Sequence, residues 1–197
     1  MADVRLIDLP DPRLDDGVVA LRGFDEDDVE SVVSACQDPE IPRWTIVPSP
    51  YTAREALAWI ETHDLLRITG IAVPFAIVDA ATRVLAGSIG LHDIDWRSRK
   101  GEIGYWVVRE LRGLGMATRA LRLVSRWALA DLRLARLELL ADVRNEVSQR
   151  VALGAGFVRE GVMRSAREIK RERCDMVLFS LVAADLGLAY VAPASDD

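Results

Sequence analysis

The stretch that most constrains the fold is GEIGYWVVRELRGLGMATRAL, at residues 101–121. Residues 102–108 are rich in Val, Ile, Tyr and Trp, which suit a half-buried strand. Further along, apolar side chains recur every three or four residues, as on one face of an amphipathic helix, at Ala117, Leu121, Val124, Ala128 and Leu132. The stretch therefore predicts a strand, a tight turn containing glycine, and a helix.

The turn contains Gly113 and Gly115 just where the helix is expected to begin. The first N–H groups of a helix have no partner within it, and the helix dipole gives this end a partial positive charge. A turn of small residues leaves these groups open to an anion. We therefore expect the turn to bind the phosphates of a ligand.

Composition limits the other partners of the chain. The 197 residues carry a formal net charge of −6, which argues against binding nucleic acid through bulk charge. Cys36 and Cys174 are far apart and outside any CxxC motif, so we expect free thiols in a reducing compartment. The sequence has no apolar run of 18 residues, and acidic residues near its start stand where a signal peptide needs basic ones, so we expect neither a membrane span nor a signal peptide. We expect a cytoplasmic protein that contacts no membrane and binds no nucleic acid directly.

Apolar patterns and capping residues predict four helices and seven strands. Helices are expected over 25–37, 52–66, 117–132 and 145–153, with Thr52 and Glu55 as a capping box and Asn145 as a cap. Strands are expected at 18–21, 71–78, 84–92, 102–108, 136–141, 157–163 and 176–182. The order β-α-α-β-β-β-α-β-α-β-β predicts an α+β fold, in which a mixed, mostly antiparallel seven-stranded sheet is flanked by about four helices.

The two ends of the chain differ from this central part. Pro10 and Pro12 interrupt residues 1–16, which we expect to be a loose leader. Residues 186–197 end in small and acidic side chains, which favours a flexible acidic tail. The folded domain is therefore expected over residues 17–185.

Two other kinds of phosphate-binding turn fit the residues less well. A P-loop needs GxxxxGK followed by Ser or Thr, and no Lys stands at the required place. A dinucleotide-binding turn needs GxGxxG, and residue 118 is Thr, although Gly113, Gly115 and the downstream Glu138 fit. Too few residues follow Gly115 for a doubly wound sheet. The P-loop is therefore excluded, and the dinucleotide-binding turn is disfavoured.

Arg112, Gly115 and Ala117 fill the pattern Q/R-x-x-G-x-G/A, and the turn thereby resembles the acyl-CoA loop of the GNAT N-acetyltransferase superfamily. GEIGYWV precedes the turn, while ADVRNEVSQRVALGAGFVREG (141–161) and CDMVLFSL (174–181) follow it. Together with RWTIVPSPYTAREALAWI (43–60), these segments resemble the branch of RimJ/RimL-type ribosomal-protein N-terminal acetyltransferases. The similarity covers about residues 17–185 and implies the GNAT fold.

The resemblance also implies a reaction. Acetyl-CoA is the expected cosubstrate, no metal is expected, and a primary amine attacks the thioester directly in a ternary complex. A protein N-terminal amine is the first expectation for the acceptor. A small-molecule amine, such as an amino sugar, a polyamine or an antibiotic, and a noncatalytic acyl-CoA-binding module stay open as alternatives. A monomer or a homodimer is expected.

By resemblance, the backbone of the turn holds the pyrophosphate of the cofactor. The residues concerned are Arg112, Gly113, Leu114, Gly115, Met116, Ala117 and Thr118. A backbone N–H near Val107 and Val108 is expected to polarise the thioester carbonyl, which can lower the barrier by roughly 3 kcal/mol. Asn145 and Ser148 match the N-x-x-S pattern of the RimJ/RimL branch, in which Asn contacts CoA and Ser lies near the sulfur.

Glu102 is the leading candidate for the general base, because a carboxylate on an apolar strand has its pKa raised by burial. An alternative reading is a structural ion pair with Arg97, Arg99 or Lys100. Glu168, in a charged segment that reaches the acceptor in relatives, is the second candidate. Ser148 is a candidate acid for the thiolate.

The acceptor side is expected to have an aromatic wall. Trp44 and Tyr51 lie in a proline-rich loop and are the candidates for that wall. Trp59 is more consistent with the core, because it lies on a predicted helix. Phe179 stands where some relatives carry a tyrosine, which removes one potential acid.

Overall fold

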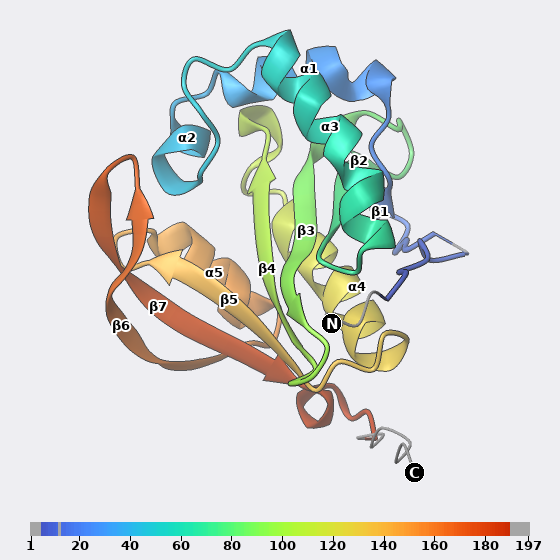
Figure 1. Cartoon of the computed structure of the whole chain (residues 1–197), viewed down its shortest axis with the longest axis vertical. Coiled ribbons are helices and arrows are strands. Elements are labelled where there is room, and N and C mark those ends of the chain that lie inside the picture. The colour runs from blue at the N-terminus through green and yellow to red at the C-terminus, as the bar shows by residue number, and fades with distance from the viewer. Residues whose placement is uncertain (1–4, 12, 190–197) are drawn as a thin grey trace.

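The computed structural model describes residues 5–11 and 13–189, and one seven-stranded sheet forms its centre (Figure 1). The strands lie in the order β1-β2-β3-β4-β5-β7-β6. Their bounds are β1 Val19–Arg22, β2 Val73–Asp79, β3 Leu85–Asp95, β4 Lys100–Val107, β5 Arg136–Asp142, β6 Val158–Ile169 and β7 Glu172–Val182. β4 and β5 are parallel, whereas the other neighbouring pairs of named strands are antiparallel. The predicted mixed, mostly antiparallel sheet is confirmed.

Two layers of helices cover the sheet. Their bounds are α1 Val29–Cys36, α2 Glu40–Trp44, α3 Ala53–Ile68, α4 Met116–Ala130 and α5 Glu146–Gly154. Neighbouring residues of a strand point to opposite faces, so Val107 joins the core beneath α4, whereas Trp106 packs with the cluster under α1 and α3. No helix in the described part of the chain is long and apolar enough to cross a membrane.

The helix after the turn forms as its sequence period predicts. Leu121, Val124 and Ala128 are fully buried against the sheet. Burial of a side chain the size of leucine contributes about 2 kcal/mol. Trp127 packs edge-on against Phe75 of β2, with ring centroids 5.5 Å apart. The α4–sheet contact therefore anchors the turn that precedes the helix.

The predicted helix starts are confirmed by their caps. Thr52 and Glu55 form the capping box of α3. The side chain of Asn145 accepts the N–H of Ser148 at 3.0 Å and caps α5. These starts depend on contacts three residues apart in sequence, which explains why they are readable from the sequence.

The charged segment 164–173, expected as a connection, continues β6 and β7 into a long hairpin. The tip residues Lys170 and Arg171 both have positive φ, 51° and 67°, as a two-residue hairpin turn requires. Neither residue is a usual turn signal, so the prediction ended both strands too early. The short helix α2 was also missed, since Pro39 and Pro42 suggested a helix end.

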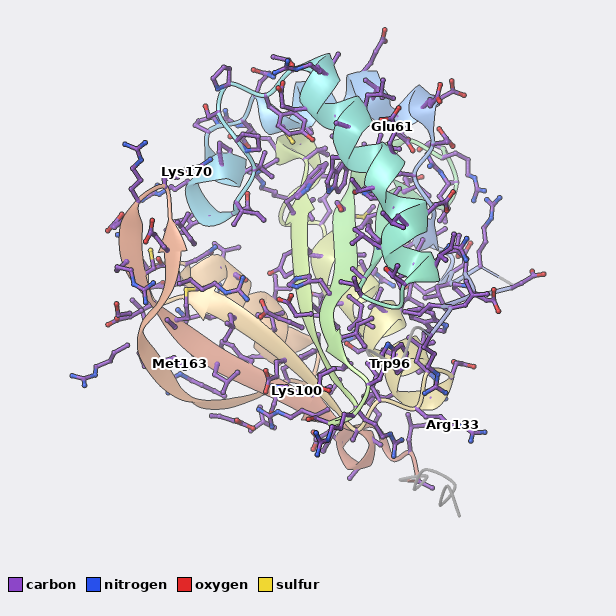
Figure 2. The ribbon with its side chains drawn as sticks, in the orientation of Figure 1. Glu61, Trp96, Lys100, Arg133, Met163 and Lys170 are labelled. Carbon is purple, nitrogen blue, oxygen red and sulfur yellow. The ribbon has the colours of Figure 1, made fainter. Side chains whose placement is uncertain are left out.

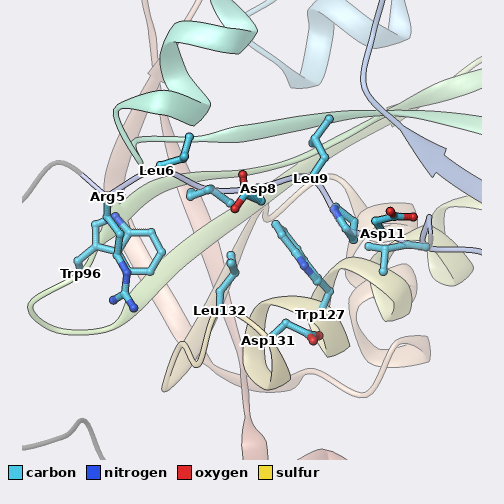
Figure 3. A pocket seen from close by; sticks show the side chains of 12 residues that line it. Arg5, Leu6, Asp8, Leu9, Asp11, Trp96, Trp127, Asp131 and Leu132 are labelled. Atoms are coloured by element: carbon cyan, nitrogen blue, oxygen red, sulfur yellow. The ribbon is translucent and has the colours of Figure 1, made fainter.

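Residues 5–11, within the segment expected as a leader, run across α4. Ile7 is buried in the core, and its N–H donates to Arg67 O at 3.1 Å. The segment covers a cavity of about 460 Å³ beside Trp96 and Trp127 (Figure 3). Most of the expected tail, residues 190–197, lies outside the described residues.

Candidate active site

The sheet opens between β4 and β5. The two strands pair at Lys100–Arg136, Gly101–Leu137 and Glu102–Glu138 and then separate. β4 continues beside β3 to Val107, whereas β5 follows β7 as far as Asp142 (Figure 1). The result is a gap that is closed at Glu102 and open toward the turn.

The direction of the β4 backbone shows which groups face this gap. Val108 donates its N–H to Ala86 O at 2.9 Å, so Val107 and Gly87 form a non-hydrogen-bonded pair. The N–H groups of Val107 and, by alternation, Tyr105 therefore point away from β3 and into the gap. The sequence predicted that the N–H of Val107 or Val108 donates to the thioester carbonyl, but the N–H of Val108 is already bonded to β3. The N–H groups that face the gap are those of Val107 and Tyr105.

The turn has the backbone that an anion site requires. Gly113 and Gly115 have φ values of 77° and 80°, in the left-handed region that favours glycine. A Cβ at either position would meet nothing within 4 Å, so open space borders the turn. The first turn of α4 carries no acidic residue. These features fit a phosphate on the N–H groups of residues 113–118.

The side chain of Arg112 holds the turn in place. Its Nε donates to Val107 O at 3.0 Å, and its guanidinium lies 2.7 Å from the carboxylate of Asp38. Arg112 therefore ties the end of β4 to the segment after α1. Its side chain positions the loop, and its own N–H donates to Arg109 O at 3.3 Å, so the expected amide contact from Arg112 is already occupied.

Ser148 and Tyr105 meet across the gap from α5 and β4. Their hydroxyl oxygens lie 3.0 Å apart, and either can donate. Burial raises the pKa of Tyr105 to about 12, so the phenol stays neutral. Ser148 lies next to the cap residue Asn145, as the N-x-x-S pattern requires. The contact between Tyr105 and Ser148 was not predicted, because it joins residues 43 positions apart in the chain.

Glu102 lies at the closed end of the gap with a side chain only 14% exposed. Burial raises the pKa of its carboxyl above the ordinary value, while the charges of Arg167 and His92 act in the opposite direction. Its ion-pair partner is Arg167 of β6, which the sequence did not identify. Lys100, one of the expected partners, instead lies 3.9 Å from Glu138.

The residues expected on the acceptor side are less closely grouped. Trp44 is half-buried at the end of α2, and its Nε1 donates to Glu40 at 3.0 Å. Tyr51 is buried in the α1–α3 core, where it can shape the loop but is largely covered. Glu168 is exposed on β6. Trp59 packs against Phe24 and the α1–α3 cluster, as expected.

The hairpin tip closes one side of this region. Lys170 Nζ donates to the backbone oxygen of Val47 in the loop between α2 and α3. Figure 2 shows Lys170 at the tip, beside α2. The contact joins the hairpin that carries Arg167 and Glu168 to the loop that carries Trp44 and Tyr51.

Comparison with known proteins defines the class. A family model described as an acetyltransferase (GNAT) domain matches residues 19–158. YdaF of Bacillus subtilis, provisionally named a ribosomal N-acetyltransferase, is 39% identical over 98 residues, which span 50% of this chain and 54% of YdaF. YoaA of the same organism, named an uncharacterized N-acetyltransferase, is 26% identical over 171 residues, or 87% of this chain and 97% of YoaA.

Among solved structures, RimJ of Mycobacterium smegmatis in complex with CoA-disulfide aligns with a TM-score of 0.79 at 21% identity, covering 88% of this chain and 86% of that one. At this sequence identity, the similarity to RimJ shows a shared fold and no more. The family model spans well over half of the chain, which therefore belongs to the GNAT acetyltransferase family. The expected GNAT fold and the class of acetyl-CoA-dependent acetyltransferase are confirmed.

Proposed function

We propose that this protein acetylates the N-terminal amine of a protein or peptide, using acetyl-CoA as the acetyl donor. The observation that carries the proposal is the gap between β4 and β5, which has free N–H groups along one side and Glu102 at its closed end. The provisional name of YdaF and the RimJ neighbour support a ribosomal-protein-like acceptor.

The residues of the gap would hold the cosubstrate in a fixed direction. The amides of residues 113–118 would bind the phosphates of acetyl-CoA at the open end. Val107 would contact the part of acetyl-CoA that links these phosphates to the thioester. At about 3.3 Å per residue, the Cα of Tyr105 lies roughly 10 Å from that of Glu102, and the Cα of Val107 roughly 17 Å. Tyr105 N–H is therefore the better donor to the thioester carbonyl, because only there can an amine also reach Glu102, directly or through water.

The acceptor approaches from the opposite face of the sheet. Val107 and Tyr105 contact the core under α4, whereas Trp106 and, by alternation, Glu102 face α1 and α3. The two substrates can then meet through the gap without competing for one surface.

An N-terminal amine suits a single carboxylate base. Its ordinary pKa is about 7.7–8.0, against about 10.4 for a lysine side chain, so much more of it is neutral near pH 7.5. Burial raises the pKa of Glu102 above its ordinary value, while Arg167 keeps the carboxylate ionised. The base therefore removes a proton that is held less tightly than the proton of a lysine side chain.

Ser148 is proposed to assist the departing sulfur. A thiol has an ordinary pKa near 8.5, so its thiolate needs only modest help. Ser148 Oγ can donate to the sulfur while Tyr105 O–H donates to Ser148. Acetyl-CoA supplies an activated acetyl group, and the chain supplies orientation, a base and this donor.

The test is release of free thiol from acetyl-CoA in the presence of matched acceptors. One peptide has a free N-terminus and no lysine, and a second has a blocked N-terminus and one lysine. Polyamines and amino sugars make up the third arm. We expect thiol release, and a peptide product heavier by one acetyl group, only with the first peptide at near-neutral pH.

Release with small amines alone would overturn the proposed acceptor. Binding of CoA without release on any acceptor would favour the noncatalytic module. A panel of N-terminal sequences then identifies which first residue is preferred.

A further inference from the structure

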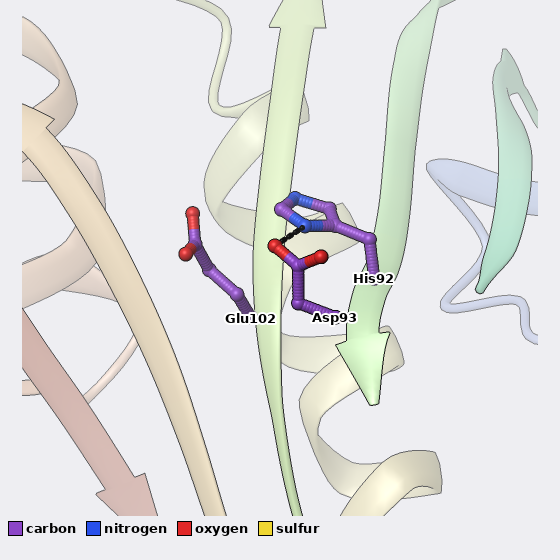
Figure 4. Close-up of side chains that lie close together, drawn as sticks. All are labelled: His92, Asp93 and Glu102. Carbon is purple, nitrogen blue, oxygen red and sulfur yellow. Dashed lines mark hydrogen bonds and ion pairs between the residues drawn. The ribbon is translucent and has the colours of Figure 1, made fainter. Parts of the chain in front are cut away.

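Two side chains, His92 and Asp93, lie beside Glu102 on the face that α1 and α3 cover (Figure 4). His92 stands opposite Glu102 in the register of β3 and β4. A ring nitrogen of His92 and one carboxylate oxygen each of Asp93 and Glu102 lie within 4.8 Å of one another. His92 Nδ1 is 3.3 Å from Asp93 Oδ2. Acetyl transfer as proposed makes no use of either residue.

The three side chains become more exposed to solvent from Glu102 through His92 to Asp93. The exposed fraction is 14% for Glu102, 34% for His92 and 74% for Asp93. A separation of up to 4.8 Å is bridged by a hydrogen bond or by one water. A continuous polar path therefore leads from the buried carboxylate to bulk water.

The backbone makes room for this path. A Cβ on Gly104 would lie 2.9 Å from His92 Nε2, so the absence of a side chain there lets the imidazole lie against β4. Asp93 has φ of 50°, a conformation that aspartate tolerates better than most residues. Both features are local to the path, and neither is needed for a regular antiparallel pair.

The other charged groups around Glu102 cannot carry a proton away. Arg167 of β6 pairs with its carboxylate, and a guanidinium keeps all its protons in a protein. Glu138 of β5, next to Glu102 in register, is engaged with Arg136 at 2.8 Å. Among the described side chains next to Glu102, His92 has two ring nitrogens, so it can accept a proton on one and release a proton from the other.

The reaction requires such a route. Acetylation of an ammonium group breaks the thioester C–S bond and forms a C–N bond, and the nitrogen loses two protons. One proton ends on the thiolate, which becomes a thiol, and the other is left on the base. Glu102 must lose that proton to water before the next turnover.

We propose that His92, assisted by Asp93, conducts this proton from Glu102 to solvent. His92 Nε2 accepts the proton from Glu102, directly or through one water, and Nδ1 gives its own proton to Asp93 or to bulk water. Rotation or proton exchange with solvent then restores the starting tautomer. His92 acts through Glu102 and touches neither substrate. This inference rests on the proposed role of Glu102 as the base.

The first test needs no acceptor. The chain has two histidines, His63 and His92, so ring ¹⁵N NMR spectra can be assigned with the His92→Gln variant. We expect Glu102→Gln to move the ring signals of His92 and to leave those of His63 in place. Glu61→Gln, on the exposed side of α3, is the control and should move neither. Unchanged His92 signals in Glu102→Gln would overturn the proposal, whatever the activity of the protein.

The second test is chemical rescue. We expect His92→Ala to lower kcat on the order of tenfold with an unchanged KM for acetyl-CoA, and added imidazole to restore most of the loss. His92→Gln, which keeps a polar side chain but cannot carry a proton, should behave alike. Glu102→Gln should gain nothing from imidazole. A full kcat in either His92 variant, or a loss that imidazole does not restore, would overturn the route. Absence of thiol release in the wild type would instead contradict the proposed function, and the NMR test would still decide the link between Glu102 and His92.

Discussion

The two faces of the gap between β4 and β5 are built in different ways. On the α4–α5 face, backbone groups and local caps make the site: the glycine turn, the N–H groups of β4 and the Asn145 cap. On the α1–α3 face, side chains from β3, β4 and β6 meet at Glu102. A backbone site can persist while many side chains change, whereas a side-chain site can change its acceptor without altering the fold. We therefore expect side-chain substitutions to alter the α1–α3 face, the proposed acceptor face, more than the α4–α5 face, the proposed cofactor face.

The variant Glu102→Gln is expected to distinguish the functions of the two faces most clearly. The variant removes the proposed base and keeps the size of the side chain, so we expect kcat to fall by about 10² or more. Acetyl-CoA affinity, measured by calorimetry, should stay unchanged. Glu168→Gln is the comparison variant, because Glu168 is the second candidate for the base and is exposed on β6. An equal loss in both variants would assign the base elsewhere.

Measurements of activity at low pH also have to account for a loss of stability that His63 causes. This side chain is buried between Phe24 and Trp59, and burial lowers its pKa to about 4 from an ordinary 6.5. Between these values the unfolded chain binds a proton that the folded chain does not, so stability falls as pH drops from 6.5 to 4. The loss approaches about 3 kcal/mol at pH 4.

Urea unfolding of wild type and His63→Leu across this range checks the effect. The variant should lose less stability on acidification, while the activity loss caused by protonation of Glu102 remains. A wild-type stability that is flat between pH 6.5 and 4 would show that His63 titrates normally.

The cofactor face is tested by Gly115→Ala. Alanine at φ of 80° costs about 1 kcal/mol of stability, and its Cβ would enter the space where we expect the phosphates. Gly187 is a matched control, since it has φ of 66°, a Cβ there would also meet nothing within 4 Å, and it lies outside the turn. We expect both variants to lose similar stability, but only Gly115→Ala to raise the Kd for CoA, by about tenfold. Equal CoA affinity in the two variants would remove the turn from the binding site.

A smaller effect is expected on the cofactor face itself, at Tyr105 and Ser148. A double-mutant cycle of Tyr105→Phe and Ser148→Ala should give a coupling of about 1 kcal/mol in the free energy of unfolding, as for an ordinary buried hydrogen bond. Ser148→Ala should lower kcat a few-fold if the hydroxyl assists the thiolate. Additive effects on stability would mean that the 3.0 Å contact contributes nothing.

The sequence predicted the local structure of the α4–α5 face well, because that structure depends on short-range rules. Gly115 at the start of α4 and Asn145 at the cap of α5 are recognised from neighbours within four residues. The mixed, mostly antiparallel character of the sheet followed from the order of strands and helices.

The acceptor face depended on contacts that sequence spacing does not encode. Arg167 reaches Glu102 because the register of β6 and β7 shifts between Met163 and Arg167. His92 lies beside Glu102 only through the register of β3 and β4. The engagement of the Val108 N–H with Ala86 could not be read from the sequence either, because the alternation of hydrogen bonds along β4 becomes known only once one bond is seen.

The most direct test of the account compares the backbone amides of β4 in two complexes, one with CoA and one with acetyl-CoA. The complexes differ only by the acetyl group, so an N–H that donates to its carbonyl should give different NMR shifts in the two. We predict such a difference for Tyr105, an equal response to both ligands for Val107, and little response for Val108, whose N–H is bonded to Ala86. A difference confined to Val108, or no difference along β4, would contradict the proposed position of the acetyl group in the gap.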